Sequence, residues 1–170
     1  AAGAGLNEAV NITATGVATV AQATTIAAAT NSGTKAIAAL TDTSAAIAAS
    51  SNGVLNLVTG TVTASDLATG AQATSIAAFT KAVVYSVSDT VANVVAASAG
   101  GRNEAVNITA TGTADVAQAT TIASSTNSGT TSIGAVTDTA ANLAGSSNAV
   151  LDKVTGVVTA TTAATGAQAI

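Results

Sequence analysis

The chain repeats itself, and this internal repetition constrains its fold more than any other feature. Residues 7–73 align without a gap onto residues 103–169 at an offset of 96, with about 48 of the 67 positions identical. The tripeptide Ala-Gln-Ala also recurs at nearly even spacing, around Gln22, Gln72, Gln118 and Gln168. Fixed periods of this length are typical of repeat architectures, in which each unit buries its apolar face only against its neighbours. We therefore expect residues 1–170 to form a single tandem-repeat domain.

Each unit, half of the longer repeat, contains two runs with the composition of a strand. The first type alternates apolar and polar residues with a period of two. It occurs at residues 10–15, 61–64, 106–111 and 157–161. The second type ends at an Asp-Thr pair, at residues 37–43, 83–90 and 133–139. Seven such runs divide the chain into coils of about 24 residues each, a length typical of solenoid repeats.

Helical spacing follows the second type of run. Val91, Val94, Val95 and Ser98 lie at positions i, i+3, i+4 and i+7, which favours a short helix with one apolar face. The sequence thus predicts an α/β repeat solenoid, with a short strand and a short helix in each coil. An all-β solenoid stays open as the alternative, because abundant Thr and Val weaken the helix signal.

The residue types present exclude most site chemistry. The chain has no His, Cys, Met, Trp or Pro, so the main ligands of zinc, haem and iron–sulfur clusters and the thiol nucleophile are missing. We expect no enzyme, no catalytic or cofactor-binding residue, no metal site and no cofactor. A net charge of −4 provides no basic surface for nucleic acid. The longest charge-free run, residues 9–34, is too rich in Thr, Asn, Gln and Gly for a transmembrane segment.

Three aspartates recur at the ends of the second type of run. Asp42, Asp89 and Asp138 are almost evenly spaced, and each precedes an Ala-rich or Val-rich segment. A side-chain oxygen at such a junction accepts a hydrogen bond from a free backbone N–H of the helix that follows. We interpret these residues as structural helix caps, in preference to a ladder of calcium ligands.

The first type of run carries a Thr-x-Thr pair each time. On these runs the Thr side chains lie opposite Ile12, Val62, Ile108 and Val158, so we expect them to point outward. The candidate surface-binding face consists of Thr13, Thr15, Thr61, Thr63, Thr109, Thr111, Thr159 and Thr161. The second type of run places Thr41 and Thr43 in phase with Ile37, so the outward Thr array is expected to be interrupted at every other coil.

Several short motifs together suggest a family. They are Asp-Thr-Ala-Ala-Asn-Leu at Asp138, with variants at Asp42 and Asp89, Val-Ala-Gln-Ala-Thr-Thr-Ile at Val20 and Val116, and Asn-Glu-Ala-Val at Asn7 and Asn103. With them the chain resembles long Ala/Thr-rich repeat proteins of bacterial cell surfaces, with cyanobacterial examples closest. The resemblance implies a secreted adhesin-like or matrix protein. The Gly-Gly-x-Gly-x-Asp run of the calcium-binding parts of such proteins is not found in this chain.

The ends of the sequence bear on the expected partners. The first residues and the closing Gly-Ala-Gln-Ala-Ile are ordinary repeat sequence, so both ends of the stack are expected to be uncapped. Open strand edges recruit other strands. We expect an extracellular or cell-surface structural protein that associates with copies of itself, end to end or laterally, into fibres, a surface layer or an adhesin stalk. The alternative is a module whose outward Thr face binds ice, polysaccharide or a mineral surface.

Overall fold

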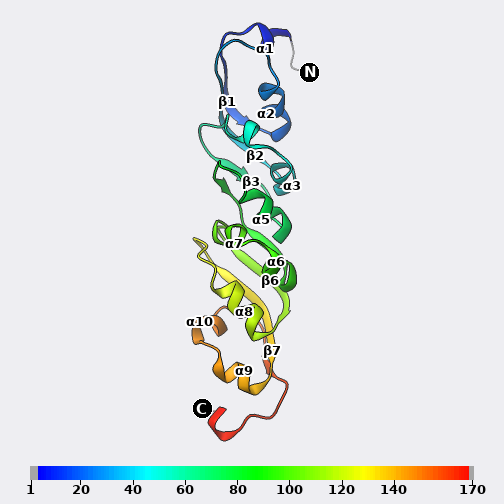
Figure 1. Ribbon diagram of the computed structural model, residues 1–170, viewed down its shortest axis with the longest axis vertical. Helices are drawn as coiled ribbons and strands as arrows, with labels where there is room; N and C mark the ends of the chain where they lie inside the picture. Colours follow the sequence, from blue (N-terminus) through cyan, green and yellow to red (C-terminus); the bar gives the residue numbers. More distant parts are fainter. Residues whose placement is uncertain (1–3, 169–170) are drawn as a thin grey trace.

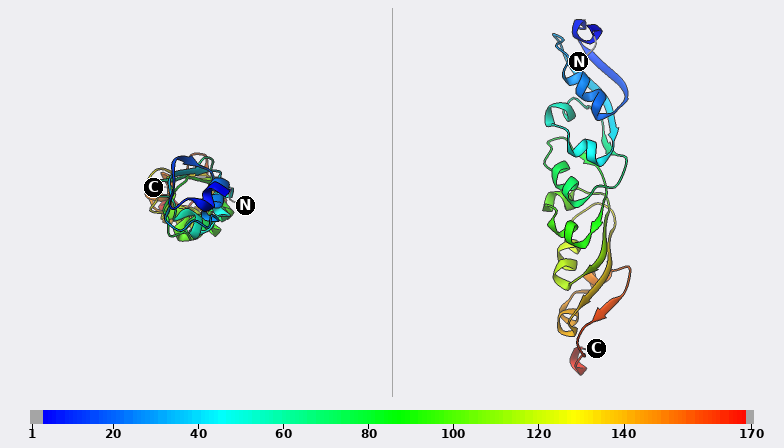
Figure 2. Two further views of the ribbon diagram at one scale, coloured as in Figure 1. Left: turned by 90° about the horizontal axis from the view of Figure 1, so that it is seen from above. Right: turned by 90° about the vertical axis from the view of Figure 1, so that its right-hand side faces the viewer.

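The computed structural model describes residues 4–168, which form a narrow rod with the two ends of the chain at opposite tips (Figure 1). The chain advances along the rod from one strand–helix unit to the next. The strands line one side of the rod and the helices the other (Figure 2). We call each unit, from the start of one strand to the start of the next, a layer.

The elements alternate regularly along the chain. The strands are β1 (Ile12–Ala18), β2 (Lys35–Asp42), β3 (Val62–Ala64), β4 (Val83–Val84), β5 (Val87–Thr90), β6 (Ile108–Ala114), β7 (Thr131–Asp138) and β8 (Val158–Ala160). The helices are α1 (Ala4–Glu8), α2 (Val20–Ala27), α3 (Ser44–Ala48), α4 (Asn52–Leu55), α5 (Gly70–Ile76), α6 (Val91–Ala96), α7 (Ala99–Asn103), α8 (Val116–Ala123), α9 (Ala140–Gly145), α10 (Asn148–Leu151) and the 3₁₀ helix η1 (Gly166–Gln168). The predicted α/β class is confirmed, and the all-β alternative is wrong.

Each strand pairs in parallel with the next strand of the chain. The strands form two four-stranded sheets, in the orders β1-β2-β3-β4 and β5-β6-β7-β8. Paired residues such as Ile12 and Lys35, or Val62 and Val83, are 21 to 23 positions apart in the sequence. Each layer is therefore slightly shorter than the coil predicted from the number of strand-like runs.

The fourth strand-like run, predicted as one strand over residues 83–90, is divided into β4 and β5. Val83 pairs with Val62, whereas Val87 is bridged to Ala68. An advance of four positions along this run therefore faces an advance of six positions along the layer before. A straight strand cannot keep both registers, and the chain changes sheets at this point. Tyr85 lies buried in the break and donates its hydroxyl to the Gly101 carbonyl oxygen at 3.0 Å. Burial, followed by the charge of Glu104, raises the pKa of this phenol above its ordinary value.

Two kinds of layer alternate along the rod. Single-helix layers contain β1 with α2, β3 with α5, β6 with α8, and β8 with η1; two-helix layers contain β2 with α3 and α4, β4 and β5 with α6 and α7, and β7 with α9 and α10. The Ala-Gln-Ala tripeptide belongs to the single-helix layers, where Gln22, Gln72 and Gln118 each complete a capping box at the start of the helix. In the two-helix layers, Ser51, Ser98 and Ser147 are the N-cap residues of the second helix. Successive tripeptides are therefore separated in the sequence by the number of residues that make up two layers.

The core is one residue deep between the strands and the helices. Its fully buried side chains are mainly Ile, Leu, Val and Ala, and the largest include Ile37, Leu40, Ile47 and Val62. Small residues let the layers approach closely. A Cβ on Gly129 would overlap the Val106 carbonyl oxygen and the Asn107 side chain of the layer before, and Gly33 has the same surroundings in the first repeat.

Replacing Gly129 with Ala should therefore separate two layers. We expect Gly129→Ala to lower the free energy of unfolding by about 2 kcal/mol, because the added methyl group meets the Val106 carbonyl oxygen and the Asn107 side chain, whose Oδ1 is held by the Thr130 N–H. Urea unfolding followed by circular dichroism measures the change.

Gly53→Ala is the matched control. Gly53 lies in α4 with free space around it, and the second repeat has Ala149 at this position. This variant should be neutral or stabilised by up to about 1 kcal/mol. Equal stability of Gly129→Ala and the unchanged chain would show that the layers are not in tight contact at this corner.

Candidate functional site

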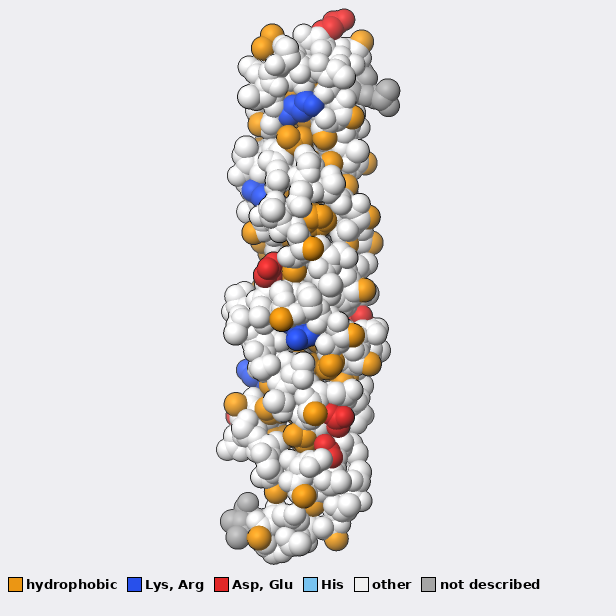
Figure 3. All heavy atoms as spheres, in the orientation of Figure 1, with side chains coloured by type: hydrophobic (Ala, Val, Ile, Leu, Met, Phe, Trp, Pro, Cys, Tyr) orange, Lys and Arg blue, Asp and Glu red, His pale blue; other side chains and the backbone are white. Residues whose placement is uncertain are grey.

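The outer face of the strands carries the predicted Thr residues. Seven of the eight side chains are exposed, and Thr63 is half-buried. The outward direction inferred from the alternation in these strands is thus observed. On the side of the rod seen in Figure 3, charged and hydrophobic side chains are scattered in small spots.

The strand register does not join the eight Thr residues into a ladder. Thr13 lies beside Ala36, and Thr109 lies between Ser88 and Ser132. Thr63 lies between Thr41 and Val84. Among the described strand pairs, none joins two of the eight residues. One of the hydroxyls also has an internal role, because Thr111 Oγ1 donates to the Asp89 carbonyl oxygen at 3.1 Å.

The expected interruption at Thr41 and Thr43 is wrong. Ile37 and Leu40 are both fully buried although three residues apart, so β2 changes phase between them. Thr41 is consequently exposed and pairs with Thr63; in the second repeat Thr137 pairs with Thr159. Thr43 is not on the strand face at all, because it is the N-cap residue of α3.

The carboxyl ends of the parallel strands form a second candidate site, where the aspartates lie. They do cap helices, but not in the predicted way. The N-cap residues of the helices that follow are Thr43, Thr90 and Thr139.

Each aspartate instead reaches the helix of the layer before. Val20 N–H donates to Asp42 Oδ2 at 2.9 Å, Gly70 N–H to Asp89 Oδ2 at 3.0 Å, and Val116 N–H to Asp138 Oδ2 at 3.0 Å. The other carboxylate oxygen accepts from the backbone of the next residue at 2.7 to 2.8 Å. Each carboxylate thus holds two layers together at this edge.

Asp66 belongs to the same row, although its role was not predicted from the sequence. Ser44 N–H donates to Asp66 Oδ1 at 2.6 Å, and in the second repeat Ala140 N–H donates to Thr162 Oγ1 at 3.0 Å. The signal was in the spacing, because Asp66 lies almost midway between Asp42 and Asp89 in the sequence. Lys35 also has an internal role, because its Nζ donates to the Ala27 and Ala29 carbonyl oxygens at 2.8 and 2.5 Å, at the C-terminal end of α2.

Hydrogen bonds favour the charged form of three carboxylates in this row. The Ser44 backbone N–H lowers the pKa of Asp66, the Asn93 side-chain amide lowers the pKa of Asp89, and the Val116 backbone N–H lowers the pKa of Asp138. Among the described residues, no group of three or more Asp and Glu side chains is arranged to hold a metal ion. The carboxylates at this edge attach each layer to the next.

Comparison with protein-family models, with curated proteins and with solved structures finds no match to this chain. Within residues 4–168, no helix has both the length and the apolar character needed to cross a bilayer.

The lowered pKa values predict how stability depends on pH. Because Asp66, Asp89 and Asp138 titrate at lower pH in the folded chain than the ordinary 3.8, their contribution is complete well above that value and is lost as the pH falls through the folded-state pKa. We expect the urea midpoint to stay nearly constant between about pH 7 and pH 5 and to fall below about pH 4. Urea titrations at a series of pH values measure this.

Changing the three residues together to Asn keeps an oxygen acceptor and removes the titration, so the fall should be smaller. Asp152→Asn is the matched control, because the first repeat has Asn56 at this position. An equally steep fall in the triple variant would contradict the assigned role of the three carboxylates.

Proposed function

We propose that this chain is a structural repeat protein: a strand–helix solenoid that forms an elongated scaffold outside the cell or on its surface, in a fibre, a surface layer or an adhesin stalk. The observation that carries the proposal is the use of polar side chains between layers, which recurs in both repeats. Thr34 N–H donates to Asn11 Oδ1 at 2.9 Å, and Thr130 N–H donates to Asn107 Oδ1 at 2.8 Å. Together with the bonds made by the aspartate row, these bonds connect the layers at both ends of the strands.

The composition of the rod supports the same role. Only 7% of the residues are charged, and the net charge of −4 is spread along the whole chain. Little electrostatic repulsion therefore opposes close contact between parallel rods. The resemblance to Ala/Thr-rich surface proteins favours the same location and the same partners, namely further copies of the chain.

The flank of the rod offers a side-by-side contact. Leu67 and Val84 are 60% and 46% exposed and line one open hollow together with Val106. The second repeat has Ala163 at the position of Leu67, so this apolar spot occurs at the middle of the rod. We propose that copies associate laterally through this spot, whereas stacked layers provide the length.

The second candidate is a surface-binding module for ice, polysaccharide or a mineral. It is supported by the cross-strand pairs of Thr41 with Thr63 and of Thr137 with Thr159. Thr41 and Thr63 recur in the second repeat as Thr137 and Thr159, but in the first repeat the next residue across the sheet is Val84 and not Thr. The register therefore favours the structural role.

Negative-stain electron microscopy of the purified chain, with and without a calcium chelator, tests the proposal. We expect ordered bundles or sheets of rods that survive chelation. Leu67→Asp combined with Val84→Asp should reduce the sedimenting fraction several-fold, because two buried charges would be left without partners.

Ala163→Asp is the control at the equivalent place in the second repeat and should assemble normally. Isolated short rods at every concentration would overturn the self-assembling role. Binding to ice or polysaccharide by such isolated rods, lost in Thr63→Ala, would establish the second candidate.

A further inference from the structure

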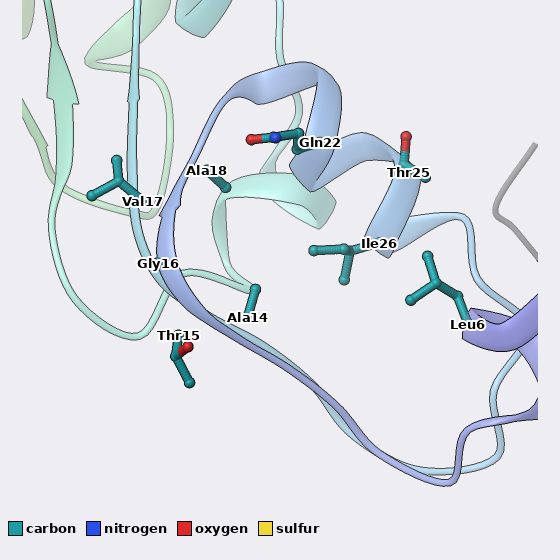
Figure 4. A pocket seen from close by; sticks show the side chains of 9 residues that line it. All are labelled: Leu6, Ala14, Thr15, Gly16, Val17, Ala18, Gln22, Thr25 and Ile26. Carbon is teal, nitrogen blue, oxygen red and sulfur yellow. The ribbon is translucent and has the colours of Figure 1, made fainter.

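The layer nearest the N-terminal tip has an uncovered face. Leu6, Ala14, Ala18, Gln22 and Ile26 contribute to a hollow of about 450 Å³ between β1 and α2. In Figure 4, Leu6 and Ile26 project into this space from their helices, and Val17 points away on the other side of the strand. We call this surface the N-terminal layer face.

The interior of the rod contains a nearly identical surface that is covered. Residues 108–123, which form β6 and α8, differ from residues 12–27 only by Thr113 in place of Val17 and Asp115 in place of Thr19. Ala110 and Ile122 are 1% and 0% exposed there, whereas the equivalent Ala14 and Ile26 are only half-buried. The difference arises because β5 pairs with β6, and α6 packs against β6 and α8.

We infer that the N-terminal layer face is a docking site for the strand and first helix of a two-helix layer, of the kind formed by residues 87–97. The interior copy gives the chemistry of this partner: a parallel strand paired as Val87 is with Ile108, then a short helix with buried Val91 and Val94. The backbone partners are also defined. In the interior, Val87 N–H donates to the Asn107 carbonyl oxygen at 2.8 Å, and Val106 N–H donates to the Tyr85 carbonyl oxygen at 2.7 Å. Asn11 and Val10 hold the equivalent positions at the tip.

The order of layers selects this partner over the end of a second copy. In the interior of the described chain, every single-helix layer lies between two-helix layers. The layer at the C-terminal tip, β8 with η1, is itself a single-helix layer, so two copies meeting end to end would place like on like. Helix α1 matches α7, the second helix of a two-helix layer, so the tip already carries the last part of the layer that fits.

Val158 illustrates the same open state at the other tip. It is 42% exposed, whereas the equivalent Val62 in β3 is fully buried beneath β4. Each end of residues 4–168 therefore exposes a single-helix layer, and a head-to-tail contact between two unmodified copies would bring two single-helix layers together.

The experiment adds one layer to the full chain. Residues 75–98 are fused ahead of residue 3, because residue 3 corresponds to residue 99 at the offset of 96, so the junction repeats the one between residues 98 and 99. A fusion of residues 57–80, equally long but of the single-helix type, is the matched control. A second control carries Val87→Asp, Val91→Asp and Val94→Asp in the added segment. Hydrogen exchange of the backbone amides of residues 13–18 is measured at dilute concentration, with the β6 amides as an internal standard for folding.

We expect the two-helix extension to slow exchange in residues 13–18 by roughly tenfold or more, since fusion makes docking intramolecular. Neither control should slow it. Equal protection by both types of extension would overturn the selectivity for a two-helix layer. Protection by neither type would overturn the docking site itself. Concentration-dependent protection of the unextended chain would show that a second copy is the occupant instead.

The inference rests on the stacking of layers proposed above, but not on lateral assembly. Protection by the two-helix extension in a chain that never forms bundles would uphold the docking site and overturn the proposed self-assembly. Bundles formed without any selective protection would uphold the proposed self-assembly and overturn the docking site.

Discussion

Each layer of this protein depends on the next for its hydrogen bonds. The parallel strands exchange backbone bonds only with strands of the neighbouring layers, and a single strand–helix unit has no antiparallel hairpin to satisfy it locally. The helices share this dependence, because the first N–H of α2 is bonded by Asp42 from the following layer. Stability in such a stack comes from interfaces between layers more than from any one layer. The alternation of single-helix and two-helix layers then decides which surfaces fit each other.

Small side chains make this arrangement possible. A rod with one apolar row between strands and helices buries mainly Ile, Leu, Val and Ala, and larger residues are rare. Tyr85 is the one buried aromatic side chain among the described residues, and it lies where the chain passes from one sheet to the other. There the phenol fills the space left by a broken strand and keeps its hydroxyl bonded to Gly101. The close approach of layers at Gly33 and Gly129 has the same origin, since a methyl group would meet backbone from the previous layer.

These constraints also account for how the polar residues are used. Asn11, Asp42, Asp66 and Asp89 hold backbone groups of neighbouring layers, and their oxygens accept bonds inside the protein. The strand β2 changes the phase of its inward-facing residues between Ile37 and Leu40, so that Thr41 is exposed and lies beside Thr63. A scaffold uses such a surface without needing a regular array of hydroxyls. A regular binding lattice needs equal neighbours at every step, and Ala36 and Val84 interrupt the rows.

The sequence by itself determined the alternation of strands and helices, the location of most strands, the helical character after the Asp-Thr pairs and the outward direction of the Thr side chains. These follow from local periodicity and from the near-identity of the two repeats, which any chain must express in the same local structure. Only the tertiary structure decided which layer receives the caps from Asp42, Asp89 and Asp138, why Asp66 belongs with them, and how the run over residues 83–90 divides. It also decided that Thr41 faces outward, because a bend that keeps both Ile37 and Leu40 buried has no signature in an alternating pattern. Contacts between layers depend on register across a whole layer of sequence, and register is set by packing and not by the local sequence.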